Sequence, residues 1–395
     1  MEPIRLLFLG TTFALGGAER ILSHLARGLN RPPFTVEILA LRAPGPLGEE
    51  LRACGLPVHS GLTHEGRFDP WLLPRLRRFL RRGRYQILYA LDHAHAVFYG
   101  CLAAAGLEAQ VRVMPVHTTG QWNGRPSLRR PIRLVRRRLD RIIAIAEAQR
   151  RYLIEEEGIP AEQLVVIPNG IPPSEAGAEE RRRLRAAVRA EMSVPEGATV
   201  CGITAVLRPE KNHELCLHAF ARARARLPRA ELWVVGDGPR RTLLEESARG
   251  LGLSYATGTG VVEAAAEGRP AVRFLGSRPD ARRLMAAMDL ALLTSHPRVE
   301  TSPLSLMEAM DAGCPVISTR VGAIEELVED GASGILVPPG DEEGLAAAIT
   351  ELLQDPSRRS GMGERGREIV RRDFSVARMV GETEALLLQL LAEKS

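Results

Sequence analysis

Short apolar runs alternate with amphipathic helical stretches along the whole chain. In the first half the runs are residues 4–10, 35–41, 86–91, 111–117, 141–146 and 164–168. In the second half they are residues 199–206, 231–238, 272–277, 290–295, 315–320 and 334–339. Short, continuously apolar runs that end in turns are typical of strands buried on both faces of a parallel sheet. The pattern predicts an α/β protein in which two similar parallel sheets follow one another.

A connector separates the two series of runs. Residues 171–180 carry proline, glycine and a run of acidic residues, which is the composition of a link between domains. A chain of 395 residues also exceeds the size, about 250 to 300 residues, at which single cores stop growing. We therefore predict a first domain over 1–170 and a second over 171–374. A last helix, with Ser375 as its N-cap, is predicted over 375–395.

Composition places the chain among soluble globular proteins. It is 45% hydrophobic and 26% charged, and its five cysteines lack the spacing of a metal or redox site, which suggests small core residues. The opening run 4–10 is too short for a membrane span and lacks the flanks of a secretory signal. A cytoplasmic location is expected.

Positive charge is concentrated in the first half. Residues 1–170 hold 24 Lys plus Arg against 15 Asp plus Glu, whereas residues 171–395 hold 29 against 33. The basic residues gather in 74–84 and in 125–141, and the second strip has apolar residues at helical spacing. Such a strip can contact anionic lipid at the inner face of a membrane, or it can simply be a solvated helix flank. Nucleic acid is not expected as a partner, because aromatic residues make up only 4% of the chain.

Two glutamates, Glu300 and Glu308, flank a predicted helix start in the second half. Glu300 follows the apolar run 290–295 on a loop, and Glu308 falls inside a helix that begins near Pro303. The first N–H groups of a helix have no partners within it and favour an anion. A phosphorylated ligand suits this place, with a carboxylate on either side to accept bonds from its hydroxyls. For an isolated pair, two solvated glutamates would be the simpler reading.

Lysine is almost absent, which makes Lys211 conspicuous. Lys211 and Lys394 are the chain's two lysines, and Lys211 follows the run 199–206 in LRPEKNH. An ammonium group with three donors suits the oxygens of a diphosphate, and open α/β sheets bind ligands at the carboxyl ends of their strands. The alternative is a surface lysine at a helix start.

Three places in the first half offer further candidates. Gly16 and Gly17 follow the first run and open a helix, so a ligand can approach the backbone closely there. His117 ends the run 111–117, where its ring can bond a sugar hydroxyl or stabilise a reacting centre. Asn169 lies in IPNGI before the connector, and a tight turn explains it adequately.

These motifs together resemble the retaining glycosyltransferases of family 4, which have the GT-B fold: two Rossmann-like domains with parallel sheets that face each other across a cleft. The runs that carry the resemblance are LGGAER, IPNGI, LRPEKNH and the stretch from His296 to Thr319. It covers nearly the whole chain. The resemblance implies a first domain that binds the acceptor, a second that binds a nucleotide sugar, and a last helix that crosses back to the first domain.

The resemblance also implies roles for single residues. Catalysis would fall to His117, Lys211 and Glu300. The donor would be bound by Gly16, Gly17, Asn169, Arg208, Lys211, Glu300, Thr301, Ser302, Pro303, Leu304 and Glu308. In that family an arginine and a lysine neutralise the diphosphate. Lys211 matches the lysine, and Arg208 would replace the arginine because Val206 stands at its usual position. The family has Gly or Cys and then an aromatic residue where this chain has Thr301 and Ser302.

The expected reaction is the transfer of a hexose-type sugar from a nucleoside diphosphate to a hydroxyl acceptor, with retained configuration. No DxD motif appears, so no metal or other cofactor is expected. A lipid-linked saccharide is the leading acceptor because the first half is basic, and the base of the donor, uracil, guanine or adenine, stays open. Two alternatives are a sugar-nucleotide epimerase of similar fold and an inactive relative that binds membrane or nucleic acid. Residues 256–271 depart from the family and suggest a flexible or weakly helical surface insertion.

Overall fold

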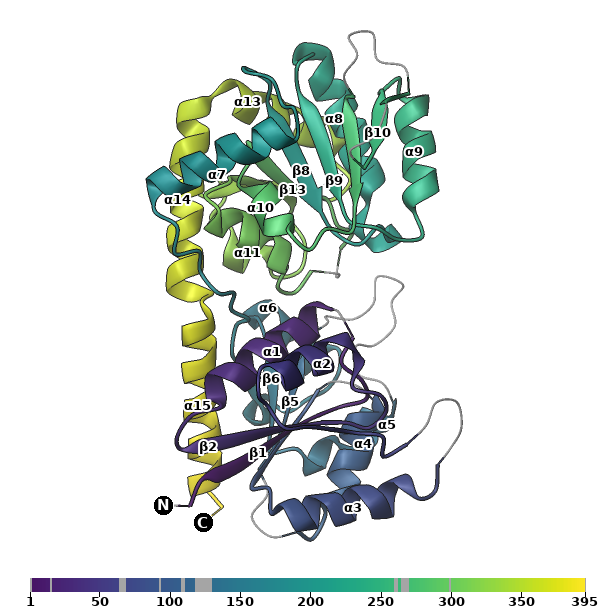
Figure 1. Cartoon of the computed structure of the whole chain (residues 1–395), viewed down its shortest axis with the longest axis vertical. Helices are drawn as coiled ribbons and strands as arrows, with labels where there is room; N and C mark the ends of the chain where they lie inside the picture. The colour runs from purple at the N-terminus through teal and green to yellow at the C-terminus, as the bar shows by residue number, and fades with distance from the viewer. Residues whose placement is uncertain are drawn as a thin grey trace. The chain divides into compact units, whose positions relative to one another are not determined.

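The structure is a computed structural model of the chain, and Figure 1 shows its elements in order. It describes residues 2–14, 16–63, 69–91, 94–107, 111–117, 130–258, 262–263, 270–297 and 300–394. Residue contacts divide the chain into two compact units. The first unit is 1–172 together with 374–395, and the second is 173–373.

Within the described residues, the first unit contains a sheet of seven parallel strands in the order β3-β2-β1-β4-β5-β6-β7. The strands are β1 Ile4–Gly10, β2 Phe34–Ala40, β3 Val58–Ser60, β4 Ile87–Ala90, β5 Val111–Val116, β6 Arg141–Ala144 and β7 Leu164–Val166. Six of them lie in the six predicted runs. β3 was not predicted because it has three residues and none of them is buried.

Helices cover both faces of this sheet. They are α1 Gly17–Leu29, α2 Gly45–Ala53, α3 Leu72–Gly83, α4 Ala94–Ala103, α5 Arg130–Val135 and α6 Glu147–Glu155, with 3-10 turns at Arg136–Arg138 and Ala161–Gln163. α3, α4 and α5 share one core with the side chains of Leu7, Leu9 and Leu39. Successive side chains of a strand alternate between faces, so Leu6 and Phe8 point to the other face. The sheet is thus buried on both sides.

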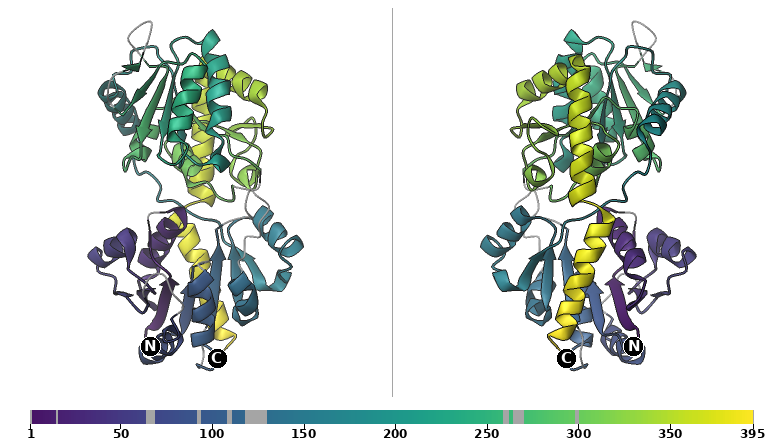
Figure 2. Two further views of the ribbon diagram at one scale, coloured as in Figure 1. Left: turned by 90° about the vertical axis from the view of Figure 1, so that its right-hand side faces the viewer. Right: turned by 90° about the vertical axis from the view of Figure 1, so that its left-hand side faces the viewer.

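The last helix, α15 Val376–Ala392, belongs to the first unit (Figure 2). It packs against α1, and Gly28 of α1 has no room for a Cβ because Val380 lies against it. Arg31 pairs with Glu384 at 3.1 Å. The predicted N-cap is confirmed, since the Ser375 hydroxyl accepts a hydrogen bond from the N–H of Arg378 at 3.3 Å.

The second unit contains, in its described part, a sheet of eight strands in the order β11-β10-β12-β9-β8-β13-β14-β15. The strands are β8 Val200–Thr204, β9 Glu231–Val235, β10 Tyr255–Thr257, β11 Val262–Glu263, β12 Val272–Gly276, β13 Leu290–Leu293, β14 Val316–Thr319 and β15 Gly334–Val337. All pairs are parallel except β10 with β11. The prediction of an α/β chain with two parallel sheets is confirmed.

The stretch 256–271 differs from its prediction where the structure describes it. Its described residues hold the end of β10 and all of β11, and the two strands pair antiparallel at the edge of the sheet. Weak helix was therefore the wrong expectation for these residues. Residues 259–261 and 264–269 lie outside the described part.

The helices of the second unit are α7 Ala178–Glu191, α8 His213–Arg226, α9 Arg241–Gly250, α10 Ala281–Met285, α11 Leu304–Asp311, α12 Ile324–Leu327, α13 Glu342–Gln354 and α14 Pro356–Asp373, with a 3-10 turn at Pro209–Lys211. α8, α9 and α13 share one core with β8, β9 and β13. α11 contacts β13 and β14 and packs against α14. Of the predicted core cysteines Cys54 is exposed, and the other four are buried.

Each sheet has a point where the strand order reverses. In the first, β2 and β3 lie on one side of β1 while β4 to β7 lie on the other. In the second, β9 to β12 lie on one side of β8 while β13 to β15 lie on the other. Connections on the two sides of such a point diverge, and open α/β sheets bind ligands at the carboxyl ends of the strands there. The loops after β8 and β13 are thus the natural ligand site of the second unit.

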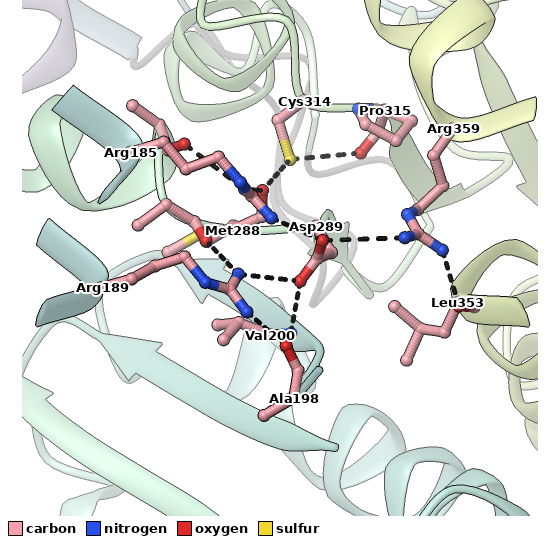
Figure 3. Close-up of polar contacts among 12 residues, drawn as sticks. Arg185, Arg189, Ala198, Val200, Met288, Asp289, Cys314, Pro315, Leu353 and Arg359 are labelled. Carbon is pink, nitrogen blue, oxygen red and sulfur yellow. Dashed lines mark hydrogen bonds and ion pairs between the residues drawn. The ribbon is translucent and has the colours of Figure 1, made fainter. Parts of the chain in front are cut away.

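At the opposite end of β13, a buried carboxylate ties the second unit together (Figure 3). Oδ1 of Asp289 accepts from Arg185 at 2.6 Å. Oδ2 accepts from Arg189 at 3.1 Å and from the backbone N–H of Val200 at 2.8 Å. Arg359 of α14 lies 3.8 Å from Oδ1. This one side chain therefore joins α7, β8, β13 and α14.

Candidate active site

Lys211 and Glu300 meet at the reversal point of the second sheet, although 89 residues separate them in the chain. Lys211 follows β8 and Glu300 follows β13, and these two strands are paired neighbours. Nζ of Lys211 donates to Oε1 of Glu300 at 2.5 Å. Glu300 is 4% exposed, whereas the Lys211 side chain is 24% exposed. A buried carboxylate with one partly exposed cation therefore lies where a ligand is expected.

The carboxylate of Glu300 is only partly used. Both of its side-chain partners, Lys211 and the hydroxyl of Ser295, donate to Oε1. In the described part of the chain, Oε2 accepts no hydrogen bond. Oε2 is not among the buried unpartnered atoms of the described residues, so it reaches the surface and is available to a ligand hydroxyl.

The backbone of Glu300 is held by the loop that follows β14. The N–H of Ala323 donates to the carbonyl of Glu300 at 3.0 Å. Gly322 has φ +59, and a Cβ there would lie 1.6 Å from the same carbonyl oxygen. Only glycine fits such an approach. On the other side, the Thr319 hydroxyl donates to the carbonyl of Ser295 at 2.8 Å.

Lys211 ends the short 3-10 turn that follows β8, and the start of α8 fixes its direction. Asn212 has φ +49, and its side chain accepts from the N–H of Leu215 at 3.4 Å as the N-cap of α8. The hydroxyl of Thr294 donates to the carbonyls of Lys211 and Asn212 at 3.2 and 2.9 Å. The two loops that carry the pair are thus bonded to each other.

The predicted helix after Glu300 is α11, with Pro303 at its N-cap position. In the described structure no side chain caps this end, so the N–H groups of its first turn, beginning with Leu304, keep no side-chain acceptor. Thr301 is buried. The hydroxyl of Ser302 is buried without a hydrogen-bond partner among the described residues. Glu308 lies one turn into the helix and is half-buried. Free N–H groups and a free hydroxyl suit an anion next to Glu300.

His213 lies behind Lys211 at the start of α8. It is 2% exposed, and both ring nitrogens lack a partner among the described residues. Burial lowers the pKa of His213 from 6.5 to about 4, and the charge of Lys211 also lowers it while Glu214 opposes this. The ring is therefore neutral at physiological pH.

Arg208, the predicted substitute for the family's arginine, is far less constrained than Lys211. Its side chain is 61% exposed, and its nearest acid is Glu210 at 3.9 Å. Val206 is also exposed. The buried residue between them is Leu207, so the segment presents Val206 and Arg208 to solvent and Leu207 to the core.

The other predicted site residues lie in the first unit. Gly16 precedes α1 with extended backbone, and a Cβ there would meet only the flexible end of the Glu19 side chain, 2.3 Å from Oε2. Gly17 is the first residue of α1. His117 directly follows β5 and is half-buried, and the residues after it, 118–129, lie outside the described part. Asn169 is buried beside Gly170, which packs on the carbonyl of Ser375. The position of Asn169 thus has a structural explanation as well.

The basic strip 125–141 is described from Arg130 onward. Ile132, Val135 and Leu139 are buried, as expected for the apolar side of the strip. Arg133 pairs with Glu157 at 3.0 Å, and Leu134 is 76% exposed. None of the described helices is long and apolar enough to cross a bilayer. The described residues also contain no cluster of side chains suited to a metal ion.

Sequence reasoning missed the residues that hold Glu300. Ser295 binds its carboxylate, and Gly322 gives its backbone room. Their signal was weak but present, because Thr294 and Ser295 directly follow the strand 290–293, and Gly322 follows the strand 316–319 after two residues. A search for hydroxyls at the carboxyl ends of neighbouring strands would have found Ser295 and Thr319.

The two parallel sheets, in each of which the strand order reverses once, place the chain in the GT-B fold class. A solved structure with this fold, HepE of Anabaena in complex with UDP, superposes with a TM-score of 0.79 over 98% of this chain and 100% of its own, at 24% identity. A family model described as Glycosyltransferase Family 4 matches residues 15–175, and one described as Glycosyl transferases group 1 matches residues 198–355. The chain belongs to the group 1, family 4 glycosyltransferases.

Curated relatives extend this comparison. The chain is 37% identical over 179 residues to a lipopolysaccharide core biosynthesis glycosyltransferase, LpsE, of Rhizobium meliloti, with 45% of this chain and 46% of that protein covered. It is 27% identical to a phosphatidyl-myo-inositol mannosyltransferase of Mycolicibacterium smegmatis, over 91% of this chain and 87% of that one. The match spans about half the length, or less, of several curated relatives, including LpsE.

Proposed function

We propose that the chain is a retaining glycosyltransferase, which moves a hexose-type sugar from a nucleoside diphosphate to a hydroxyl acceptor. The observation that carries the proposal is the Lys211–Glu300 pair at the reversal point of the second sheet. A cation and a carboxylate side by side match a donor that has an anionic diphosphate next to a sugar rich in hydroxyls. Unit two is accordingly the proposed donor-binding domain, and unit one the acceptor-binding domain.

In the proposed reaction the bond from the anomeric carbon to the diphosphate breaks while the acceptor oxygen bonds to the same face of the sugar. The leaving phosphate oxygen takes the acceptor proton. The diphosphate departs with negative charge, so fixed donors around it lower the barrier. Lys211 supplies the main cation, Arg208 a second, and the first N–H groups of α11 add to both. Lys211 exchanges Glu300 for phosphate oxygens when the donor binds.

The sugar and ribose sides of the donor fall to the two glutamates. Oε2 of Glu300 accepts from a hydroxyl of the transferred sugar, and Glu308 accepts from the ribose. Ser302 gives its unpartnered hydroxyl to the phosphate or sugar, with Thr301, Pro303 and Leu304 lining the same place. By the family resemblance, His117 faces the sugar, and Gly16, Gly17 and Asn169 contribute to donor binding from the first unit.

The relatives favour a particular donor and acceptor class. HepE was solved with UDP and also with UDP-glucose, and the named activities of the relatives concern lipopolysaccharide and a phosphatidyl-inositol lipid. We propose a UDP-sugar as donor and a lipid-linked saccharide as acceptor, in polysaccharide synthesis. The strip 125–141 supplies the contact with anionic lipid at the membrane surface, since Leu134 is exposed among arginines.

A thermal-shift screen with UDP, GDP and ADP tests donor binding directly. A ligand that binds only the folded chain raises the melting temperature, so one diphosphate should stabilise the wild type and fail to stabilise Lys211→Ala. The matched control is Lys394→Ala, which removes the other lysine and its ion pair with Asp140 in the first unit. Equal stabilisation of the wild type and Lys211→Ala would contradict the proposal.

Product analysis separates transfer from its rivals. With the stabilising sugar nucleotide, product should form only when a hydroxyl acceptor is present. Conversion of the donor alone would mean an epimerase. The same assay with excess EDTA should run at an unchanged rate, because the proposed chemistry places Lys211 and helix N–H groups where a metal would otherwise stand. Activity lost with EDTA and restored by magnesium or manganese would refute that part.

A further inference from the structure

A pocket of about 480 Å³ opens in the first unit beside the edge strand β3. One wall comes from the sheet, where Arg5 of β1, Glu37 of β2 and His59 of β3 all point to the same face. The other wall comes from α3, which contributes Phe79 and arginines. Arg5 stands near the start of β1 and Leu62 follows the end of β3, so this α3 pocket runs along the β3 side of the sheet. The proposed reaction makes no use of it.

The floor of the α3 pocket is a carboxylate whose bonds are complete. Oε1 of Glu37 pairs with Arg5, and Oε2 accepts from the hydroxyl of Tyr85 at 2.7 Å and bonds Nε2 of His59 at 2.8 Å. Burial by itself would raise the pKa of Glu37, but the bonds from Tyr85 and His59 and the charge of Arg5 outweigh it and lower the pKa. The acid therefore stays ionised and compensated, and it has no need of a ligand.

An aromatic surface lies above this floor. The ring of Phe79 stacks on Tyr85 with centroids 5.7 Å apart and planes at 19°, and it meets His59 edge-on at 5.0 Å. A Cβ at Gly83 would lie 2.1 Å from the Tyr85 ring, so this glycine leaves the ring its place. Phe79 is only partly buried and presents apolar surface to the pocket.

The rim is positively charged and unsatisfied. Arg75, Arg78 and Arg82 recur at the spacing of one helix face, and all three line the pocket. Arg75 pairs with Asp69 at 2.5 Å. Arg78 and Arg82 are exposed, and within the described chain neither makes a hydrogen bond or an ion pair. Two neighbouring guanidinium groups thus lack an anion.

A second cavity, of about 420 Å³ in the other unit, shows that arginines around a hollow need not imply a ligand. There Arg181 pairs with Glu364 at 2.7 Å, and Arg185 pairs with Asp289 at 2.6 Å. Arg359 donates to the carbonyls of Leu352 and Leu353. Those groups are engaged within the protein, whereas Arg78 and Arg82 are not.

We infer that the α3 pocket binds a phosphate monoester with an aromatic or apolar body, with the phosphate on Arg78 and Arg82 and the body against Phe79. Guanidinium groups match phosphate oxygens in geometry and charge, and an aromatic wall adds affinity for a flat or apolar group. A soluble phosphorylated metabolite and a lipid phosphate share this chemistry. The site explains why the basic run 74–84 carries arginines on a face that does not pack into the core.

Calorimetric titration of the full chain with phenyl phosphate tests the inference. We expect saturable binding of one ligand, about fivefold tighter than inorganic phosphate because of the aromatic wall. The double variant R78Q/R82Q should weaken binding at least about tenfold. The control R81Q/R84Q removes two charges from the same end of α3 outside the pocket lining, and it should change affinity less than about twofold.

Three results would overturn the inference: no saturation in the wild type, equal loss in both double variants, or phenyl phosphate no tighter than phosphate. The titration is repeated in Lys211→Ala, because the proposed donor site also takes phosphate oxygens. Binding at the α3 pocket should survive that change, so failure of the donor proposal leaves this test intact. Loss of all binding in Lys211→Ala would place the ligand at the donor site instead.

A vesicle arm distinguishes the two sources of the phosphate. Phosphatidylcholine vesicles with about one fifth phosphatidic acid should bind the wild type more than R78Q/R82Q if the ligand is a lipid. Phenyl phosphate should then compete. Equal binding of the two proteins to these vesicles, with the difference in phenyl phosphate affinity retained, assigns a soluble ligand.

Discussion

Strand β13 has a buried carboxylate close to each end, and the protein bonds the two in opposite ways. Asp289, before the strand, has protein donors on both oxygens, including two arginines and the N–H of Val200 (Figure 3). Glu300, after the strand, has Lys211 and Ser295 on one oxygen, and in the described chain nothing on the other. Both side chains are at least nine-tenths buried.

The difference separates a structural acid from a binding acid. A buried charge is tolerated only when donors compensate it, and Asp289 has more donors than its charge requires. Its arginines come from α7 and α14, so the bonds hold helices to the sheet. At Glu300, one carboxylate oxygen and the partly exposed ammonium of Lys211 are available to a ligand. Its surroundings are complete only when a ligand with hydroxyls and an anionic group is added.

The largest expected effect is on stability, at Asp289. Asp289→Ala leaves the N–H of Val200 without its acceptor and leaves Arg185 and Arg189 with backbone carbonyls but no counter-charge, so the free energy of unfolding should fall by about 3 to 5 kcal/mol. Urea unfolding measures this. The control is Glu179→Ala, which removes an exposed acid that also pairs with two arginines and should cost below about 1 kcal/mol. Equal losses in the two variants would break the comparison.

Glu300→Gln should instead lower turnover and leave the stability of the fold nearly unchanged. The amide oxygen can still accept from Lys211 and Ser295, so unfolding should change by less than about 1 kcal/mol. Turnover should fall about 10²- to 10³-fold, because the charge next to the reacting sugar is lost. Steady-state transfer rates and urea curves on the same preparation give both numbers. A variant that transfers at the normal rate would remove Glu300 from the site.

Much of the architecture could be predicted because parallel strands buried on both faces leave plain apolar runs. β3, β10 and β11 could not, since each is two or three residues long and contains a polar residue, so no apolar run marks it, unlike the equally short edge strand β7. The contact of Lys211 with Glu300 can be predicted from sequence only if β8 and β13 are known to be parallel neighbours, because the carboxyl ends of such strands lie at the same edge of the sheet.

The support of the site depended on contacts that no local pattern contains. Gly322 is required by the carbonyl of Glu300, which is 22 residues away in the chain. In the sequence, Asp289 is an ordinary acid before a strand, and no nearby residue predicts its contacts with Arg185, Arg189 or Arg359. The basic run 74–84 likewise predicted a charged strip, but not that Arg75 and Arg77 would be bonded within the protein while Arg78 and Arg82 line a pocket without a partner among the described residues.

His213 is a third case beside Asp289 and Glu300, because it is a buried titratable group whose ring nitrogens have no hydrogen-bond partner among the described residues. Its pKa of about 4 in the folded chain lies below the 6.5 of an exposed histidine, so the unfolded chain binds the proton first. Stability from this group is complete above pH 6.5 and is lost as the pH falls toward 4, by up to about 3 kcal/mol.

Removing the ring should therefore flatten the pH dependence. Unfolding free energies of wild type and His213→Leu, measured at several values from pH 7 to 4, should diverge by up to about 3 kcal/mol, with the variant less sensitive to acid. The control is His218→Gln on the same helix, which removes a histidine whose ring is 45% exposed instead of buried. Parallel profiles for wild type and His213→Leu would show that His213 accepts a proton in the folded chain.

The smallest effect is expected at Arg208, which tests whether position or charge alone makes Lys211 important. Arg208 is 61% exposed against 24% for Lys211, so water and salt screen its pull on a diphosphate. Arg208→Gln should lower kcat/KM by about tenfold or less, and the loss should shrink further at high salt. Lys211→Ala should cost far more at every salt concentration, because its ammonium lies beside a buried acid. If the two variants lose equal activity, a largely exposed cation would serve the donor as well as a partly exposed one. The difference between Asp289, with donors on both oxygens, and Glu300, with donors on one, would then not identify the end of β13 at which the donor binds.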